Sequence, residues 1–146
     1  MKFVIKTMDR VEGLKKMTYS FLKLHGVKDK DIYIFVSKEK DFDDYWEAFP
    51  DCLIILGPKG IVPIDNFIVD YFVEGEKYIY LNDDIKRLYY AEDKKKLRVV
   101  DDFNPLIEKT FKMMEEHSIS YAGLNPVGNP YFMRNQPEFK LSLIHI

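Results

Sequence analysis

The sequence predicts an α/β fold with a mostly parallel sheet that is covered by helices on both faces. Four short apolar runs, rich in β-branched and aromatic residues, occur at residues 3–5, 32–36, 53–56 and 78–81. Such runs are typical of buried strands. Segments with helical spacing lie between them. Strands that alternate with helices favour a parallel sheet, with ligands bound beyond the carboxyl ends of the strands.

Each predicted helix carries one apolar stripe that we expect to be buried. The first helix ends at Gly26, the second begins at Asp41 and ends before Pro50, the third precedes Gly75, and the fourth begins at Asp102. The stripes are Leu14, Met17, Phe21 and Leu24; Phe42, Tyr45, Trp46 and Phe49; Ile61, Ile64, Ile68, Tyr71 and Phe72; and Ile107, Phe111 and Met114.

Composition bounds the class of protein. The chain has 146 residues, a formal net charge of −2, 47% hydrophobic and 15% aromatic residues. These values indicate one folded domain and exclude disorder as the main state. The near-zero charge argues against a whole-surface attraction to nucleic acid. The single Cys52 excludes an intrachain disulfide, and no run is long enough for a signal peptide or a membrane span, so we expect a soluble protein of a reducing, cytoplasmic compartment.

An acidic motif follows the fourth predicted strand directly. Asn82, Asp83 and Asp84 would lie at the carboxyl end of a buried strand. Their oxygen atoms suit Mg²⁺ or Mn²⁺, which would screen a diphosphate. A helix cap or a simple turn explains the acidic pair alone equally well. The order of elements favours the metal site, and the sequence has no glycine-rich phosphate loop, so a nucleotide would be held by metal and loop residues.

Several motifs together resemble a known family. They are FVIKTMDR at 3–10, DIYIFV at 31–36, NFI at 66–68, LNDDI at 81–85, and YAGLNP at 121–126 followed by NPYFM at 129–133. Over residues 2–140 the chain resembles GT-A-fold glycosyltransferases that use nucleotide-sugar donors, and within them the TET-associated glycosyltransferases of phages. The resemblance implies a metal-dependent transferase of the hexosyltransferase type with a GT-A (Rossmann-like) fold.

The resemblance also implies the roles of individual residues. Thr7 and Arg10 would line the nucleotide pocket, Glu39 would lie near the base or ribose, and Asn66 would face the diphosphate or sugar. Asp84 would bind Mn²⁺ or Mg²⁺ together with Asp83. Asn82 and Asp83 would also contact the ribose or a metal-bound water. Gly123 and Asn129 would lie on the acceptor side.

The implied partners are a nucleotide-sugar donor, such as a UDP-sugar, and an acceptor, such as a hydroxymethylated pyrimidine of phage DNA. The expected location is the cytoplasm of a phage-infected or bacterial host, without a membrane partner. Two alternatives stay open, namely a nucleotidyltransferase of related fold and a catalytically silent module that binds nucleotide or DNA.

Three positions depart from the family pattern. Asn82 stands where the family usually has an acid, Asp65 where it has a basic residue, and Ala122 where it has a tryptophan. A carboxylate at position 65 would repel a diphosphate if it faced the site.

The final six residues, LSLIHI at 141–146, equal the translation of CTG TCT CTT ATA CAC ATC, the mosaic-end adapter of transposase-based sequencing libraries. We therefore expect residues 1–140 to form a single, incomplete GT-A-like domain. The region that supplies the catalytic base in this fold would then lie downstream, and no base is assigned.

Two other features have plain structural interpretations. The charged run at 93–98 could contact a nucleic-acid backbone, but a solvated loop is favoured. Trp46 and its aromatic neighbours repeat at helical intervals, which favours core packing over a base-stacking platform.

Overall fold

The computed structural model describes residues 1–93 and 96–123, in two compact units that divide between Lys86 and Arg87. The predicted acceptor-side Asn129 and the adapter-like segment 141–146 lie outside the described residues. The first unit contains β1 (Lys2–Lys6), α1 (Val11–Leu14), η1 (Lys15–Tyr19), α2 (Ser20–Leu24), η2 (Asp29–Asp31), β2 (Ile32–Val36), α3 (Glu39–Ala48), β3 (Leu53–Leu56), α4 (Ile61–Tyr71) and β4 (Tyr78–Leu81). The second contains β5 (Tyr89–Asp93), β6 (Lys96–Val99) and α5 (Phe103–Glu116).

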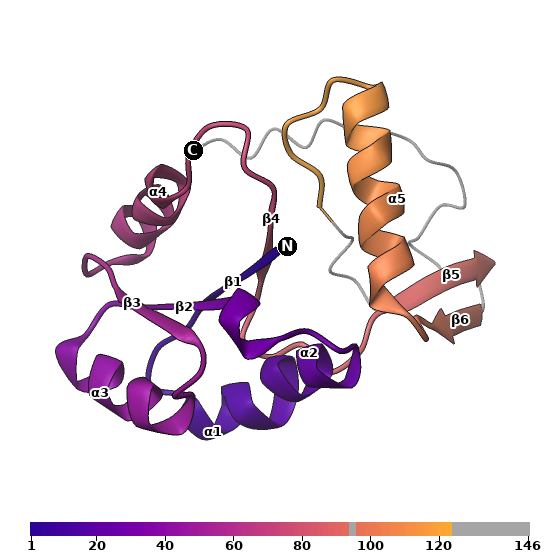
Figure 1. The fold of residues 1–146 in the computed structure, drawn as a ribbon. Helices are drawn as coiled ribbons and strands as arrows, with labels where there is room; N and C mark the ends of the chain where they lie inside the picture. The colour runs from indigo at the N-terminus through magenta and orange to yellow at the C-terminus, as the bar shows by residue number, and fades with distance from the viewer. Residues whose placement is uncertain (94–95, 124–146) are drawn as a thin grey trace. The chain divides into compact units, whose positions relative to one another are not determined.

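The first unit is built on a four-stranded parallel sheet in the order β3-β2-β1-β4. All four predicted strands and the α/β class are confirmed. The connections between parallel strands are right-handed. When the next strand is added at the opposite side of the sheet, its connecting helix therefore covers the opposite face. The helices α1, α2 and α3 accordingly lie on one face of the sheet, and α4 lies on the other (Figure 1).

The core beneath α4 is an aromatic and aliphatic cluster. Val4 of β1 and Phe35 of β2 pack against Ile64 and Ile68 of α4 and against Phe72, all of which are buried. The ring of Phe35 meets that of Phe72 edge to face, with centroids 6.3 Å apart. The spacing of Ile64 and Ile68 by four residues places both on one helix face, so the predicted α4 stripe is confirmed at its centre.

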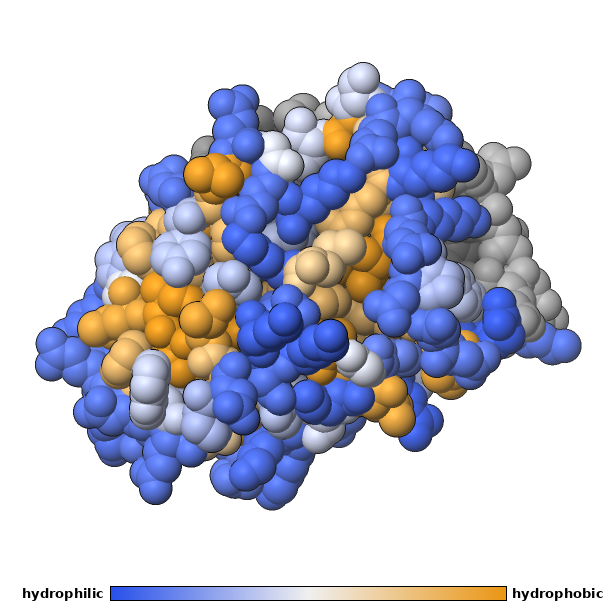
Figure 2. Space-filling view, viewed as in Figure 1, coloured by the Kyte–Doolittle hydropathy of each residue, from blue (hydrophilic) through white to orange (hydrophobic). Residues whose placement is uncertain are grey.

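The ends of two predicted stripes are exposed. Ile61 and Tyr71, the first and last residues of α4, are 75% and 45% exposed, although the Tyr71 ring still meets that of Phe35 edge to face at 5.3 Å. Trp46 is 56% exposed and stacks on Phe42 at 5.9 Å, so its predicted place in the core was wrong. Figure 2 shows a group of apolar side chains on the left of the view, near β3, which is the edge strand of the sheet.

The first helical segment differs from its prediction in register. Leu24 was expected in the core but is 81% exposed, whereas Leu22 is fully buried. The reason is η1, a π-helical segment between α1 and α2. A π turn contains an extra residue, which rotates every later side chain around the helix axis. Leu14 and Leu22 therefore face the core, together with a polar residue, Thr18.

The second unit pairs β5 with β6 in an antiparallel hairpin. The predicted solvated loop at 93–98 was wrong for its described residues, because Asp93 and residues 96–98 belong to these strands. The predicted start of α5 is confirmed, since the Asp102 side chain accepts a hydrogen bond from the Asn104 backbone at 3.0 Å. No described helix combines the length and the apolar character needed to cross a membrane.

The π-helical register gives a direct test with a matched pair of leucines. We expect Leu22→Ala to lower the free energy of unfolding by about 2–5 kcal/mol, because it opens a cavity in the core. Leu24→Ala should change it by less than about 0.5 kcal/mol, because that side chain is solvated. Urea unfolding of both variants measures the difference. Equal effects would contradict the register described here.

Candidate functional site

The candidate site lies where the strand order reverses. β1 has β2 on one side and β4 on the other. In open α/β sheets such a reversal leaves a crevice beyond the carboxyl ends of the strands, because the two following loops diverge. The loop of residues 7–10 follows β1 and the turn of residues 82–85 follows β4. The predicted residues Thr7, Arg10 and Asp83 are brought together at this point.

A closed circuit of hydrogen bonds joins these two segments. The Arg10 backbone N–H donates to the Tyr45 hydroxyl at 3.1 Å. The Thr7 hydroxyl lies 2.8 Å from that of Tyr45 and donates to Asp83 Oδ2 at 2.8 Å. Because a carboxylate only accepts, the single proton of Thr7 goes to Asp83 and Tyr45 donates to Thr7. The Arg10 guanidinium closes the circuit by donating to Asp83 Oδ1 at 3.0 Å.

The helix α3 supports this loop from beneath. Asp41 and Tyr45 lie one turn apart on α3, and both are buried. Asp41 accepts from the Asp9 backbone N–H at 3.3 Å, and Tyr45 accepts from the next N–H, that of Arg10. Burial raises the pKa of Tyr45 above its ordinary value, so its hydroxyl keeps its proton. Asp41 was predicted to open this helix, but α3 begins at Glu39 and Asp41 serves the neighbouring loop instead.

Asp9 gives the loop its sharp direction. Its backbone has a φ of 53°, in the left-handed region that Asp adopts more readily than most side chains. Lys38 forms an ion pair with the Asp9 carboxylate. The hydrogen bond from Lys38 lowers the pKa of Asp9, so the carboxylate stays charged.

The two adjacent aspartates have different environments. Asp83 is partly buried and both of its oxygens accept bonds, from Thr7 and Arg10. Asp84 is exposed and has no ion pair within the described part of the chain. Thr18 holds the turn itself, since its hydroxyl donates to the Asn82 carbonyl at 2.6 Å and accepts from the Ile85 N–H at 2.8 Å. Residues 1–93 and 96–123 contain no cluster of three or more His, Cys, Asp or Glu side chains able to hold a metal.

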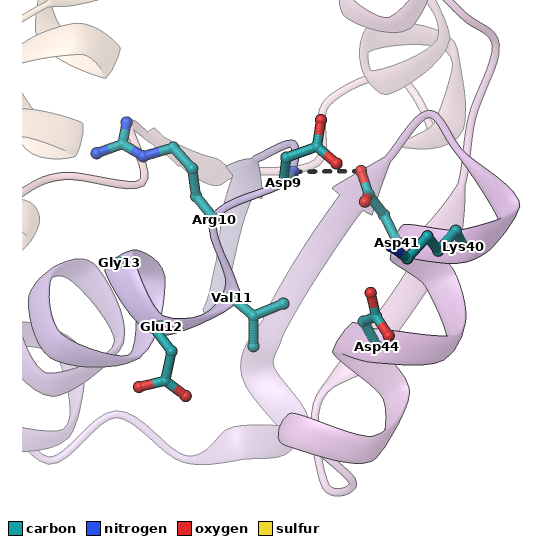
Figure 3. A pocket seen from close by; sticks show the side chains of 8 residues that line it. All are labelled: Asp9, Arg10, Val11, Glu12, Gly13, Lys40, Asp41 and Asp44. Atoms are coloured by element: carbon teal, nitrogen blue, oxygen red, sulfur yellow. Dashed lines mark hydrogen bonds between the residues drawn. The ribbon is translucent and has the colours of Figure 1, made fainter.

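A pocket of about 510 Å³ opens beside Arg10 (Figure 3). It lies between the loop after β1, the start of α1 and the first turns of α3. The lining residues are Asp9, Arg10, Val11, Glu12, Gly13, Lys40, Asp41 and Asp44. The Arg10 side chain points away from Asp41 and Asp44 (Figure 3), toward its partner Asp83. The acidic lining suits the uncharged part of a nucleotide better than its phosphates, because like charges repel.

Asp65 is neutralised within the chain. Its Oδ1 lies 2.6 Å from Lys6 Nζ, and Tyr80 donates to the same oxygen at 3.2 Å. Lys6 ends β1 and Tyr80 belongs to β4, so the pair lies on the α4 side of the sheet. The expected repulsion between Asp65 and a diphosphate is therefore reduced by an adjacent positive charge.

The remaining predicted site residues that the structure describes are exposed. Glu39 begins α3, next to the pocket residue Lys40, and its side chain is exposed. Asn66 is exposed on α4, and Gly123 is exposed in the second unit. Sequence reasoning did not single out Thr18, Asp41 and Tyr45 as site residues. Each of these residues carries a polar group at a helix position that faces the core, and this pattern could have indicated them.

The circuit predicts that the Tyr45 hydroxyl stabilises the loop. We expect Tyr45→Phe to lower the free energy of unfolding by about 1–3 kcal/mol, because the Arg10 N–H loses its acceptor and Thr7 loses a donor. Tyr33→Phe is the matched control, since the Tyr33 hydroxyl bonds no other described group, and should change stability by less than about 0.5 kcal/mol. Thermal or urea unfolding of the two variants provides the measurement, and an undisturbed Tyr45→Phe would contradict the circuit.

Comparisons with known proteins identify the family of this chain. Searches of curated proteins and of solved structures find no match. The family model described as TET-Associated Glycosyltransferase matches residues 1–135, which include both segments of the site. The resemblance noted in the sequence is thereby confirmed, and the chain belongs to the TET-associated glycosyltransferase family.

Proposed function

We propose that the chain transfers a sugar from a nucleotide-sugar donor of the UDP-sugar type, with Mn²⁺ or Mg²⁺ held at Asp84. The observation that carries the proposal is the exposed Asp84 carboxylate on a fixed turn at the carboxyl end of β4, where the preceding residue, Asp83, accepts from Arg10. This edge of the sheet is where ligands bind in open α/β folds.

The donor set fits a metal that is shared with a diphosphate. Mg²⁺ is commonly held by one or two carboxylates together with substrate phosphates, so a complete protein cage is not required. Asp84 supplies a solvated carboxylate that has no competing ion pair among the described residues. Asp83 already accepts two bonds, so we assign it to holding Arg10 and to a metal-bound water or the ribose.

The remaining groups would contact different parts of the donor. The side chain of Arg10 is 48% exposed and uses one of its five N–H donors on Asp83, so others remain for a phosphate oxygen. The nucleoside would occupy the pocket between the loop and α3, with Glu39 and Lys40 at its edge. Thr7 is buried, so its contribution is indirect and passes through Asp83. Asn66 would approach the diphosphate or sugar from α4.

The reaction exchanges one bond of the anomeric carbon for another. The bond from that carbon to the diphosphate oxygen breaks, and a bond to the acceptor hydroxyl oxygen forms as the hydroxyl proton leaves. A bound metal would stabilise the negative charge that develops on the leaving diphosphate. The Arg10 guanidinium would add a second positive group at the same place. We assign no catalytic base.

The acceptor that we propose is a hydroxymethylated pyrimidine in DNA. The family's association with TET supports this class of acceptor. Incubation of the chain with labelled nucleotide sugar and DNA that contains 5-hydroxymethylcytosine tests it. Label on that DNA, and none on unmodified DNA of the same sequence, is the expected result.

The metal and donor assignment predicts a stabilisation that needs three components. We expect one nucleotide sugar, with Mn²⁺, to raise the melting temperature of the full chain. At a hundredfold excess of ligand over Kd, the added free energy of unfolding would be about 2.7 kcal/mol. Asp84→Asn should remove the Mn²⁺-dependent part of this shift. Asp70→Asn, which neutralises an exposed carboxylate on α4, is the matched control and should retain it.

The same panel separates the alternatives. Nucleotide sugars, nucleoside diphosphates and nucleoside triphosphates are compared with and without Mn²⁺. A preference for triphosphates would support a nucleotidyltransferase of related fold. A folded wild type that no nucleotide stabilises in a metal-dependent way would contradict the proposal and favour a silent binding module.

The ion pair between Lys6 and Asp65 yields a separate prediction. Lys6→Gln leaves Asp65 without its neutralising partner, so we expect nucleoside diphosphate affinity to fall roughly two- to fivefold, as expected for a solvated charge worth less than about 1 kcal/mol. The double variant Lys6→Gln/Asp65→Asn should recover that affinity, because both charges are gone. Isothermal titration of the four proteins completes a double-mutant cycle. An affinity in Lys6→Gln equal to that of wild type would show that the pair does not influence the site.

A further inference from the structure

The turn after β4 is bonded at both of its ends by the same side chain. In a closed β-turn the carbonyl of the first residue accepts directly from the N–H of the fourth. Here the Thr18 hydroxyl lies between these two groups. It donates to the Asn82 carbonyl at 2.6 Å and accepts from the Ile85 N–H at 2.8 Å. The hydroxyl therefore bridges the first and fourth residues of the turn.

Thr18 is well placed to hold this geometry rigidly. Its side chain is fully buried, and the hydroxyl uses both its proton and a lone pair on the turn. It belongs to η1, the π-helical segment between α1 and α2. π-helical turns are rare and occur often at functional sites. In this chain the π-helical segment contains the hydroxyl that enters the turn.

The central residues of the bridged turn are the two aspartates. Asp83 is also fixed through its side chain, which accepts from Thr7 and Arg10. Asp84 is exposed and lacks any such bond to the described residues, so the position of its side chain depends on the backbone of the turn that carries it. Thr18 bonds to that backbone at both ends of the turn.

We propose that Thr18 is a positioning residue for the metal-dependent binding of the donor, because its hydroxyl holds both ends of the turn that carries Asp84. This inference rests on the proposed function. A positioning role and a purely structural role differ in what the loss of the hydroxyl would change. Loss of the hydroxyl should weaken the coupling between metal and nucleotide, and not merely the stability of the fold.

The test compares two substitutions at the same position. Thr18→Val keeps the shape but removes the hydroxyl, which leaves the Asn82 carbonyl and the Ile85 N–H without their bridge. Thr18→Ser keeps the hydroxyl and removes a methyl group. Thr18→Ala supplies a second hydroxyl-free variant, should the valine variant fail to fold. Leu22→Ala is the control for lost stability, because it lies on the same helical run and contacts the core.

The measured quantity is the factor by which Mn²⁺ increases nucleotide affinity. The probe is whichever of UDP, GDP, CDP and ADP gives the largest Mn²⁺-dependent shift with wild type, titrated calorimetrically at a temperature where circular dichroism shows every variant folded. We expect the factor to fall roughly ten- to a hundredfold in Thr18→Val or Thr18→Ala, as is usual when a group supporting a metal ligand is lost. Thr18→Ser and Leu22→Ala should keep it.

Three other results would overturn the inference, and they are distinguishable. If wild type couples Mn²⁺ to nucleotide and the folded hydroxyl-free variants do so equally, Thr18 has no positioning role while the proposed function stands. If wild type shows no coupling with any of the four nucleotides, the proposed function fails and the role of Thr18 fails with it. A loss of coupling in Leu22→Ala as large as that in Thr18→Val would reduce Thr18 to a general structural residue.

Discussion

The site depends on one circuit of hydrogen bonds that ties the loop after β1 to the turn after β4. The circuit begins at the Arg10 backbone, passes through the hydroxyls of Tyr45 and Thr7 to Asp83, and returns through the Arg10 guanidinium. Each donor has an acceptor, so burying these groups leaves no orphan among the described side chains. Because the two segments follow neighbouring parallel strands, the circuit holds them against each other.

Three hydroxyls do much of the positioning at this site, while Arg10 and Asp84 remain at its surface. Tyr45, Thr7 and Thr18 are buried or nearly so. Buried hydroxyls cost far less desolvation energy than buried charges, provided that they are hydrogen-bonded. Arg10 and Asp84 stay accessible to solvent, where a diphosphate and a metal ion would arrive. This division lets a chain with near-zero net charge present a locally charged site.

The two segments that flank the sheet contribute to the site through irregular backbone. Asp9 adopts a left-handed conformation, and Thr18 lies in a π-helical segment. Both features occur directly beside the carboxyl ends of β1 and β4. Such irregularities cost free energy unless surrounding contacts compensate for it. Here the compensating contacts are the bonds from Asp41 to the Asp9 backbone and from Thr18 to the turn.

The sequence by itself determined the strands, the parallel sheet and the acidic turn at the end of β4. Hydrophobic periodicity, and the alternation of strands with helices along the chain, can both be read from local sequence. The sequence also indicated Arg10 and Asp83, through the family motifs. Only the tertiary structure showed that Leu24 and Trp46 are exposed, that Lys6 neutralises Asp65, and that Thr18 bridges the turn. These features depend on a π-helical register and on contacts between residues 59 or more positions apart in the chain. No local pattern encodes such contacts, since they form only when the sheet brings its loops together.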